Sequence, residues 1–210
     1  GHPKKGRQTA GVARQYCGNT GKIDNCVTTV HLTYTSFDGE FRTMIDSELY
    51  LPKCWHEDRE RCHAARIPDN VVYRPKYQIA LEQLDRATAE GVRFAWITAD
   101  EWYTQKPVFV AGLERRGQRF VLETPRNFAV WLHDPACGPQ TPAKSVENLC
   151  RWSRAMMQQP WQRYVIKDTD KGLMVWEVKC APCWLPRGGG VVGPDWLIVA
   201  RNALDPSEVK

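Results

Sequence analysis

Several runs within the first fifty positions show strand-like patterns, in part with apolar and polar residues alternating with a period of two, which predicts β-strands. Residues 11–16 and 26–35 are two such runs, joined by a turn-rich segment at 18–22. A hairpin turn at 36–39 leads into a third run, which ends at Pro52. The sequence therefore predicts three antiparallel strands in succession.

The alternation also predicts which side chains of these strands enter the core. The expected apolar face consists of Val30, Leu32, Tyr34, Phe41, Ile45, Leu49 and Leu51. The expected solvent face carries His31, Thr33, Arg42, Asp46 and Glu48. An antiparallel sheet with one covered face has this composition.

Helical periodicity begins after Pro52. Residues 55–66 are rich in charge and predict a surface helix, and residues 76–90 predict a longer amphipathic one that ends at Gly91. The apolar stripe of the longer helix consists of Tyr77, Ala80, Leu81, Leu84 and Ala87.

The segment 94–103 is the most informative one for function. An apolar run ends there in the acid pair Asp100 and Glu101, beside two aromatic residues. Such a run predicts a strand covered on both faces, and ligands of α/β sheets gather at the carboxyl ends of such strands. Asp100 is therefore a candidate metal ligand. The alternative is an ordinary loop acid that caps the next helix.

A helix is predicted at 107–116 and a strand at 119–124. The predicted order is therefore three strands, a helix, a strand, a helix and a strand. A mixed sheet flanked by helices is compatible with this order. The sequence pattern changes after Pro125. The later segments are a Pro- and Gly-rich stretch at 134–142, a helix at 146–157, strands at 173–179 and 196–201, and a flexible loop at 186–190.

Composition places the 210-residue chain among soluble globular proteins, with 42% hydrophobic and 25% charged residues. No apolar run approaches the ~20 residues that span a bilayer, and the first residues do not resemble a secretory signal. We expect a cytoplasmic protein. The chain lacks an initiator Met and a polar tail after its last strand-like stretch, so we treat it as a fragment.

The net charge of +5 permits nucleic-acid binding without requiring it. Its distribution is more informative, because Lys4, Lys5, Arg7 and Arg14 precede any acid in the chain. Small residues around them allow a loop to lie close to a phosphate backbone. The alternative is a solvated basic end.

The eight cysteines are too scattered to predict a disulfide framework, and free thiols are expected in a reducing compartment. Only Cys180 and Cys183 have metal-type spacing, which leaves a zinc-organised binding protein as an alternative. The nine tryptophans are also scattered, which favours core and boundary packing over a base-stacking platform.

Several blocks resemble the DDE superfamily endonucleases, the transposases of bacterial insertion sequences that have a ribonuclease-H-like catalytic domain. The blocks, in family order, are residues 1–6, 12–18, 46–52, 94–103, 200–202 and 204–209. The resemblance implies a ribonuclease-H-like mixed sheet flanked by helices. Residues 1–128 would form part of this core, and 129–210 a β-rich insertion in the C-terminal part.

The resemblance also implies cleavage and joining of DNA by two-metal phosphoryl transfer, with Mg²⁺ or Mn²⁺ held by three carboxylates. Asp100 matches the second of these acids. The first belongs upstream of Gly1 and the third beyond Lys210, and neither Asp46 nor Glu208 is assigned to replace them. We therefore expect this polypeptide to be inactive by itself.

Other implied features are finer. Lys4 and Lys5 would contact the DNA backbone near the cleaved phosphate, Glu101 would be structural, and Thr104 stands where the family commonly has Gly. The implied partners are transposon-end and target DNA, and a second copy of the chain in a synaptic homodimer. A degenerate relative that binds DNA without cutting it is the alternative within this resemblance.

Overall fold

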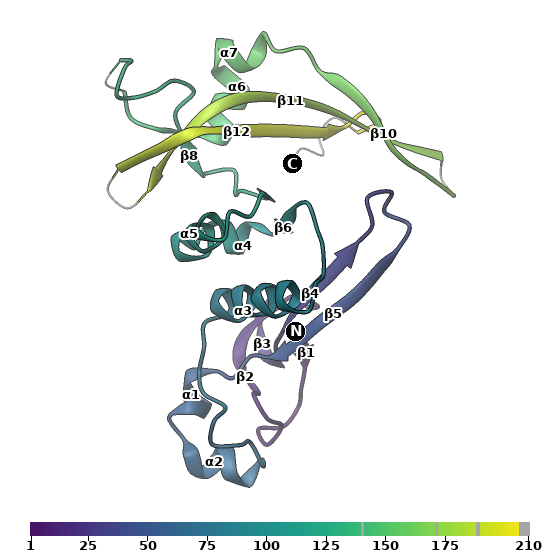
Figure 1. The fold of residues 1–210 in the computed structure, drawn as a ribbon, viewed down its shortest axis with the longest axis vertical. Helices are drawn as coiled ribbons and strands as arrows, with labels where there is room; N and C mark the ends of the chain where they lie inside the picture. Colours follow the sequence, from purple (N-terminus) through teal and green to yellow (C-terminus); the bar gives the residue numbers. More distant parts are fainter. Residues whose placement is uncertain (140, 171, 188–189, 206–210) are drawn as a thin grey trace. The chain divides into compact units, whose positions relative to one another are not determined.

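The computed structural model describes residues 1–139, 141–170, 172–187 and 190–205 (Figure 1). The chain divides into two units: unit 1 comprises residues 1–97 and 108–120, and unit 2 comprises residues 98–107 and 121–210. Several small sheets and short helices make the fold mixed α/β. The ribonuclease-H-like sheet and the boundary at residue 128 stay predictions.

Unit 1 begins with two antiparallel sheets. Their strands are β1 (His2–Pro3), β2 (Ala13–Cys17), β3 (Lys22–Val27), β4 (Thr29–Thr35) and β5 (Arg42–Leu49). The first three have the order β1-β3-β2, and β4 and β5 form a hairpin of their own. The predicted strand at 26–35 is thus two strands, because β3 already pairs with β2 across a turn that contains Gly21 in a left-handed conformation (φ 65°).

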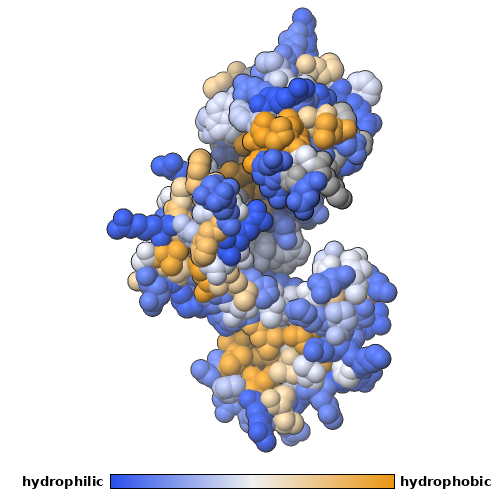
Figure 2. Space-filling view, turned by 90° about the vertical axis from the view of Figure 1, so that its right-hand side faces the viewer, coloured by the Kyte–Doolittle hydropathy of each residue, from blue (hydrophilic) through white to orange (hydrophobic). Residues whose placement is uncertain are grey.

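The apolar face predicted for β5 is wrong. Ile45 and Leu49 are each 37% exposed, although Val30 on the neighbouring strand is buried as predicted. Glu48 lies opposite Val30 across the hairpin, so the acids expected in solvent, Asp46 and Glu48, occupy the covered side. Figure 2 shows that apolar patches reach the molecular surface between polar side chains.

The helices of unit 1 follow these sheets in the chain. They are α1 (Lys53–His56), α2 (Arg59–Ala64), α3 (Lys76–Ala89) and α5 (Pro107–Arg115), whose first residue belongs to unit 2. The helix predicted at 55–66 is divided, because the Asp58 carboxylate accepts a hydrogen bond from the Arg61 N–H (3.0 Å) and starts α2. The helix predicted at 76–90 is confirmed as α3, and Gly91 follows it with φ 78°.

A tryptophan forms the centre of one core cluster in unit 1. The cluster contains Val12, Val27, Leu51, Trp55, Cys62 and Ile67. The Trp55 ring is fully buried, and its Nε1–H donates a hydrogen bond to the Val12 carbonyl (2.7 Å). The Arg61 guanidinium lies 3.8 Å from the ring centroid, which adds a cation–π contact.

In unit 2 a long antiparallel sheet is covered on one face by short helices (Figure 1). The sheet consists of β10 (Gln162–Thr169), β11 (Gly172–Arg187) and β12 (Gly190–Asn202), and the helices are α6 (Val146–Trp152) and α7 (Arg154–Met157). A pair of two-residue strands, β8 (Ala129–Val130) and β9 (Lys144–Ser145), precedes them. The strands β11 and β12 extend well beyond the predicted ones and include most of the predicted loop at 186–190, whose residues 188 and 189 lie outside the described ones.

The core of unit 2 lies between this sheet and the helices. It consists of Val130, Leu149, Met156, Ala181, Cys183, Leu197 and Val199. Lys179 is also buried there, where its ammonium donates to the Met156 carbonyl (2.9 Å) and lies over the Trp161 ring.

We expect Trp55→Phe to lower the free energy of unfolding by about 2 kcal/mol, because the buried Val12 carbonyl loses its donor. Denaturant unfolding followed by circular dichroism measures this change. The matched control is Trp96→Phe in the same unit, where the ring is 54% exposed; its effect should stay within about 0.5 kcal/mol. Equal effects of the two substitutions would contradict the assignment of Trp55 to the core.

Candidate functional site

Asp100 follows a short strand that is less covered than the sequence predicts. This strand, β6 (Ile97–Ala99), pairs with β7 (Phe120–Leu122). Thr98 is exposed and its two neighbours are only half-buried, so the expectation of a strand covered on both faces is wrong.

The two strands of this pair run in the same direction. The Ile97 N–H donates to the Arg119 carbonyl and the Glu123 N–H donates to the Ala99 carbonyl (3.0 Å each), so the bonded positions advance together along both strands. Asp100 and Glu123 thus follow the carboxyl ends of neighbouring parallel strands. No local pattern in the sequence marks Glu123, since its position depends on the pairing of β6 with β7.

The Asp100 carboxylate caps helix α4 (Glu101–Thr104). Its Oδ1 accepts a hydrogen bond from the Trp102 N–H (3.0 Å), and its own backbone is extended (φ −73°, ψ 172°). The capping role considered from the sequence is therefore present. Glu101 is exposed in the first turn of the helix.

Thr104 fastens the other end of α4. Its Oγ1–H donates to the Glu123 carbonyl (2.6 Å), a bond that glycine cannot form. Helix α4 is thereby tied to the residue that follows β7.

The described residues do not complete a metal site. Nowhere in the described part of the chain do three His, Cys, Asp or Glu side chains gather closely enough to hold an ion. Asp100 fits the role of one oxygen ligand, and a hard cation requires several. Asp46 is unsuited to the role because its carboxylate pairs with Arg86 (2.9 Å). Glu208 lies outside the described residues.

The predicted basic residues gather in unit 1. The Asn25 side-chain amide donates to the carbonyls of Lys4 (2.6 Å) and Gly6 (2.9 Å), and Arg14 lies opposite Asn25 in the β2–β3 ladder. The segment is also held by Arg61, whose guanidinium donates to the carbonyl of Arg7 (2.8 Å).

All four predicted cations are exposed. Lys4, Lys5, Arg7 and Arg14 make no ion pair with any residue that the structure describes. We use the name basic segment for residues 4–14. Cations that have no acidic partner among the described residues, on a segment held by contacts to its backbone, can meet phosphate without first breaking an ion pair.

The zinc alternative lacks its central pair of ligands. Cys180 and Cys183 are three residues apart on β11, so their side chains lie on opposite faces of the strand. Cys180 is exposed, and Cys183 is buried in the core. All eight cysteines are free thiols.

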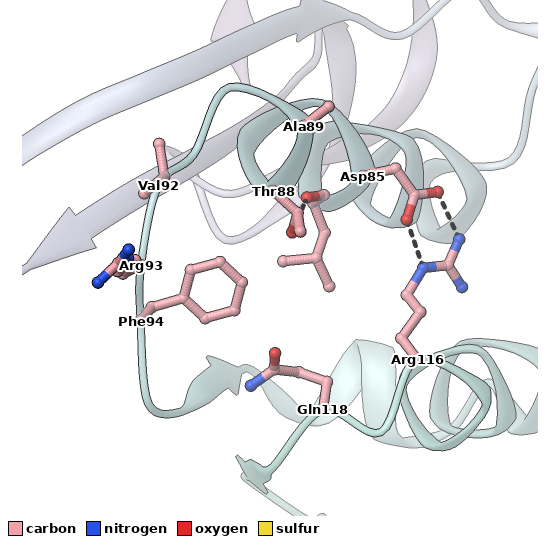
Figure 3. A pocket seen from close by; sticks show the side chains of 9 residues that line it. Asp85, Thr88, Ala89, Val92, Arg93, Phe94, Arg116 and Gln118 are labelled. Carbon is pink, nitrogen blue, oxygen red and sulfur yellow. Dashed lines mark hydrogen bonds and ion pairs between the residues drawn. The ribbon is translucent and has the colours of Figure 1, made fainter.

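A cavity of about 570 Å³ lies in unit 1 beside α3 (Figure 3). The Arg116 guanidinium closes one side of it by donating two hydrogen bonds to the Asp85 carboxylate (2.6 Å each), and these bonds lower the pKa of Asp85. Phe94 lies on the opposite side, and Gln118 lines the cavity between Phe94 and Arg116. Because the ion pair engages both charged groups, we assign the Asp85–Arg116 contact a structural role.

The family model of the DDE superfamily endonucleases matches residues 1–168. The chain belongs to this family. The resemblance inferred from the sequence blocks is confirmed for that range, which includes the basic segment and Asp100; the blocks at 200–202 and 204–209 lie beyond it.

No curated protein and no solved structure matches the chain significantly. The ribonuclease-H-like fold of this DDE superfamily endonuclease therefore stays a prediction. No described helix combines the length and the apolar character needed to cross a bilayer.

We expect the phenol of Tyr103 to lose its proton at a higher pH than an ordinary tyrosine. Burial raises the pKa of Tyr103 to about 12, and the negative charge of Asp100 acts in the same direction. The folded protein thus keeps the phenol protonated at pH values above the ordinary pKa of 10. The contribution of this group to the free energy of unfolding is therefore complete below pH 10 and is lost as the pH rises through about 12. Tyrosinate absorbance at 295 nm measures the titration.

Tyr103→Phe should remove one tyrosine from the late phase of this titration and none from the phase near pH 10. The exposed Tyr164 provides the matched control through Tyr164→Phe. Loss of signal from the early phase in Tyr103→Phe would show that the pKa of this half-buried phenol is not raised.

We expect the basic segment to dominate salt-dependent binding of duplex DNA. In Lys4→Gln/Lys5→Gln, the slope of log K against log salt concentration should fall by about one unit for each lost phosphate contact. Fluorescence anisotropy with a random-sequence duplex measures the slope. The double substitution Arg115→Gln/Lys167→Gln removes the same charge from other exposed positions; an equal fall there would mean that net charge, and not this segment, determines binding.

Proposed function

We propose that this protein is a transposase that cleaves and joins DNA by metal-dependent phosphoryl transfer. The observation that carries the proposal is the family match, which includes the basic segment and Asp100 within one continuous range. Transposon-end and target DNA would be the substrates. A homodimer that synapses two ends belongs to the same proposal.

In this proposal Asp100 supplies one ligand for Mg²⁺ or Mn²⁺. Its location after the carboxyl end of β6 supports the role, because side chains at strand ends are held by the sheet behind them. The cap on α4 further restricts the orientation of the carboxylate. Two-metal chemistry requires more carboxylates than the described residues bring together.

The basic segment has a separate role in the proposal. Its exposed cations would contact backbone phosphates, which positions DNA without reading its sequence. This contact needs no divalent ion. Binding and cleavage are therefore separable by experiment.

A second candidate function is that of a relative that binds DNA without cutting it. The specific observation in its favour is that the basic segment is formed, while no cluster of three metal-ligating side chains occurs among the residues described. The two functions differ in one measurable respect. A transposase nicks element-end DNA when Mg²⁺ or Mn²⁺ is added, and the second candidate does not.

We expect Asp100→Asn to abolish nicking by the intact protein while leaving DNA binding unchanged. Asn is an equally good helix cap, so the substitution removes the charge and keeps the fold of α4. Loss of a partner outside the metal's own ligands typically costs 10–100-fold, so loss of a direct ligand should reduce the rate by more than about 100-fold. A gel assay with labelled element-end DNA measures the rate.

The matched control is Glu101→Gln at the neighbouring acid, which should nick at close to the original rate. Full activity of Asp100→Asn would refute the assignment of this residue. Binding of element-end DNA by the intact, unsubstituted protein that supplies all three acids, with no nicking in either metal, would favour the second candidate function.

A further inference from the structure

Unit 2 contains a cavity of about 650 Å³ that none of the preceding roles uses. Its floor includes Val130 and Leu149, which belong to the core of the unit. Two indole rings line it, those of Trp131 and Trp152. The volume lies within the range of about 300–1,000 Å³ that is usual for small-molecule sites.

Trp131 is fixed in place. Its Nε1–H donates to the Thr141 carbonyl (2.6 Å), and its backbone exchanges hydrogen bonds with Trp184 on β11 (3.0 and 2.9 Å). The side of the cavity that Trp131 forms is therefore attached to the sheet of β10, β11 and β12.

Trp152 is placed very differently. It is the last residue of α6, and it is 72% exposed although it lines the cavity. An indole ring is among the largest apolar groups of a protein and is usually well covered. Here the ring leaves most of its surface available for stacking.

The charge of the cavity is positive. Lys144 and Arg154 line it, and both are exposed and make no ion pair with a described residue. No acidic side chain is among its described lining residues, and the amide of Asn148 adds a polar group that can donate and accept. An aromatic face beside unpaired cations is the combination that binds single-stranded nucleic acid.

We propose that this cavity binds an unpaired nucleotide, with its base stacked on Trp152 and its phosphate contacted by Lys144 and Arg154. A base inside a duplex already has neighbours on both faces, so only an unpaired or extruded base can stack on the indole. The occupant is thus a single-stranded end or an unpaired position in DNA. The inference rests on the proposed function for its biological context, but the binding itself requires no cleavage.

The test compares two duplexes that differ in one unpaired nucleotide. The unsubstituted protein should bind the duplex with the unpaired nucleotide more tightly, and Trp152→Ala should reduce that affinity by about tenfold and abolish the preference. Trp152→Phe, which keeps a smaller ring, should retain part of it. Fluorescence anisotropy without divalent metal measures both affinities, and circular dichroism checks the fold.

The matched control is Trp196→Ala. Trp196 is 66% exposed in the same unit, on β12, and does not line the cavity. The Trp196→Ala variant should bind both duplexes with the same affinities as the unsubstituted protein. Lys144→Gln/Arg154→Gln should weaken binding of both duplexes and reduce the salt dependence.

The absence of any preference for the unpaired nucleotide would overturn the inference, as would an unchanged preference in Trp152→Ala or an equal loss in Trp196→Ala. Failure of DNA cleavage would leave these outcomes unaffected. Conversely, nicking that depends on Asp100 would persist if the cavity had no role, so the two proposals fail separately.

Discussion

Two arginines allow the acidic face of the hairpin β4–β5 to be covered. The Arg86 guanidinium donates to Asp46 (2.9 Å) and Glu48 (3.1 Å), and Arg74 joins Glu48 to Glu82 on α3. Carboxylates that are partly removed from water need cationic partners, so α3 can lie on an acidic face only because these arginines neutralise it. Each strand side chain that turns inward leaves its neighbour pointing outward, and the apolar residues of β5 are consequently the exposed ones.

The sequence predicted those parts of the fold that local signals determine. Helix α3 follows from its apolar stripe and from Gly91, and the inner face of β4 follows from alternation. The covered face of β5 could not be predicted in this way, because Arg86 pairs with an acid that precedes it by 40 residues. The lengths of β11 and β12 were missed for a related reason: each strand supplies the hydrogen bonds of the other, so pairing extends both beyond their apolar centres.

The candidate site also shows that only features marked by local sequence signals could be predicted. Asp100 was found because an apolar run and the acid that ends it are adjacent in the chain. Glu123 was not found, since it reaches the same edge only through the parallel pairing of β6 with β7. That the tryptophans pack and do not form a stacking platform stays a prediction. Trp131 and Trp152 are 21 positions apart and line one cavity because β8 and α6 lie against the same core, so their proximity could not be predicted from the sequence.

Capping a helix and binding a cation are compatible demands on Asp100. A carboxylate has two oxygens with about four acceptor positions, and the N–H of Trp102 occupies one of them. The cap restricts the side chain, so part of its conformational entropy is already lost before any ion binds. The bond from Thr104 to the Glu123 carbonyl holds the far end of α4. A ligand on a segment fastened at both ends is oriented in advance, which is the property that a metal site requires of its side chains. The capping contact therefore supports the proposed role of this carboxylate and does not compete with it.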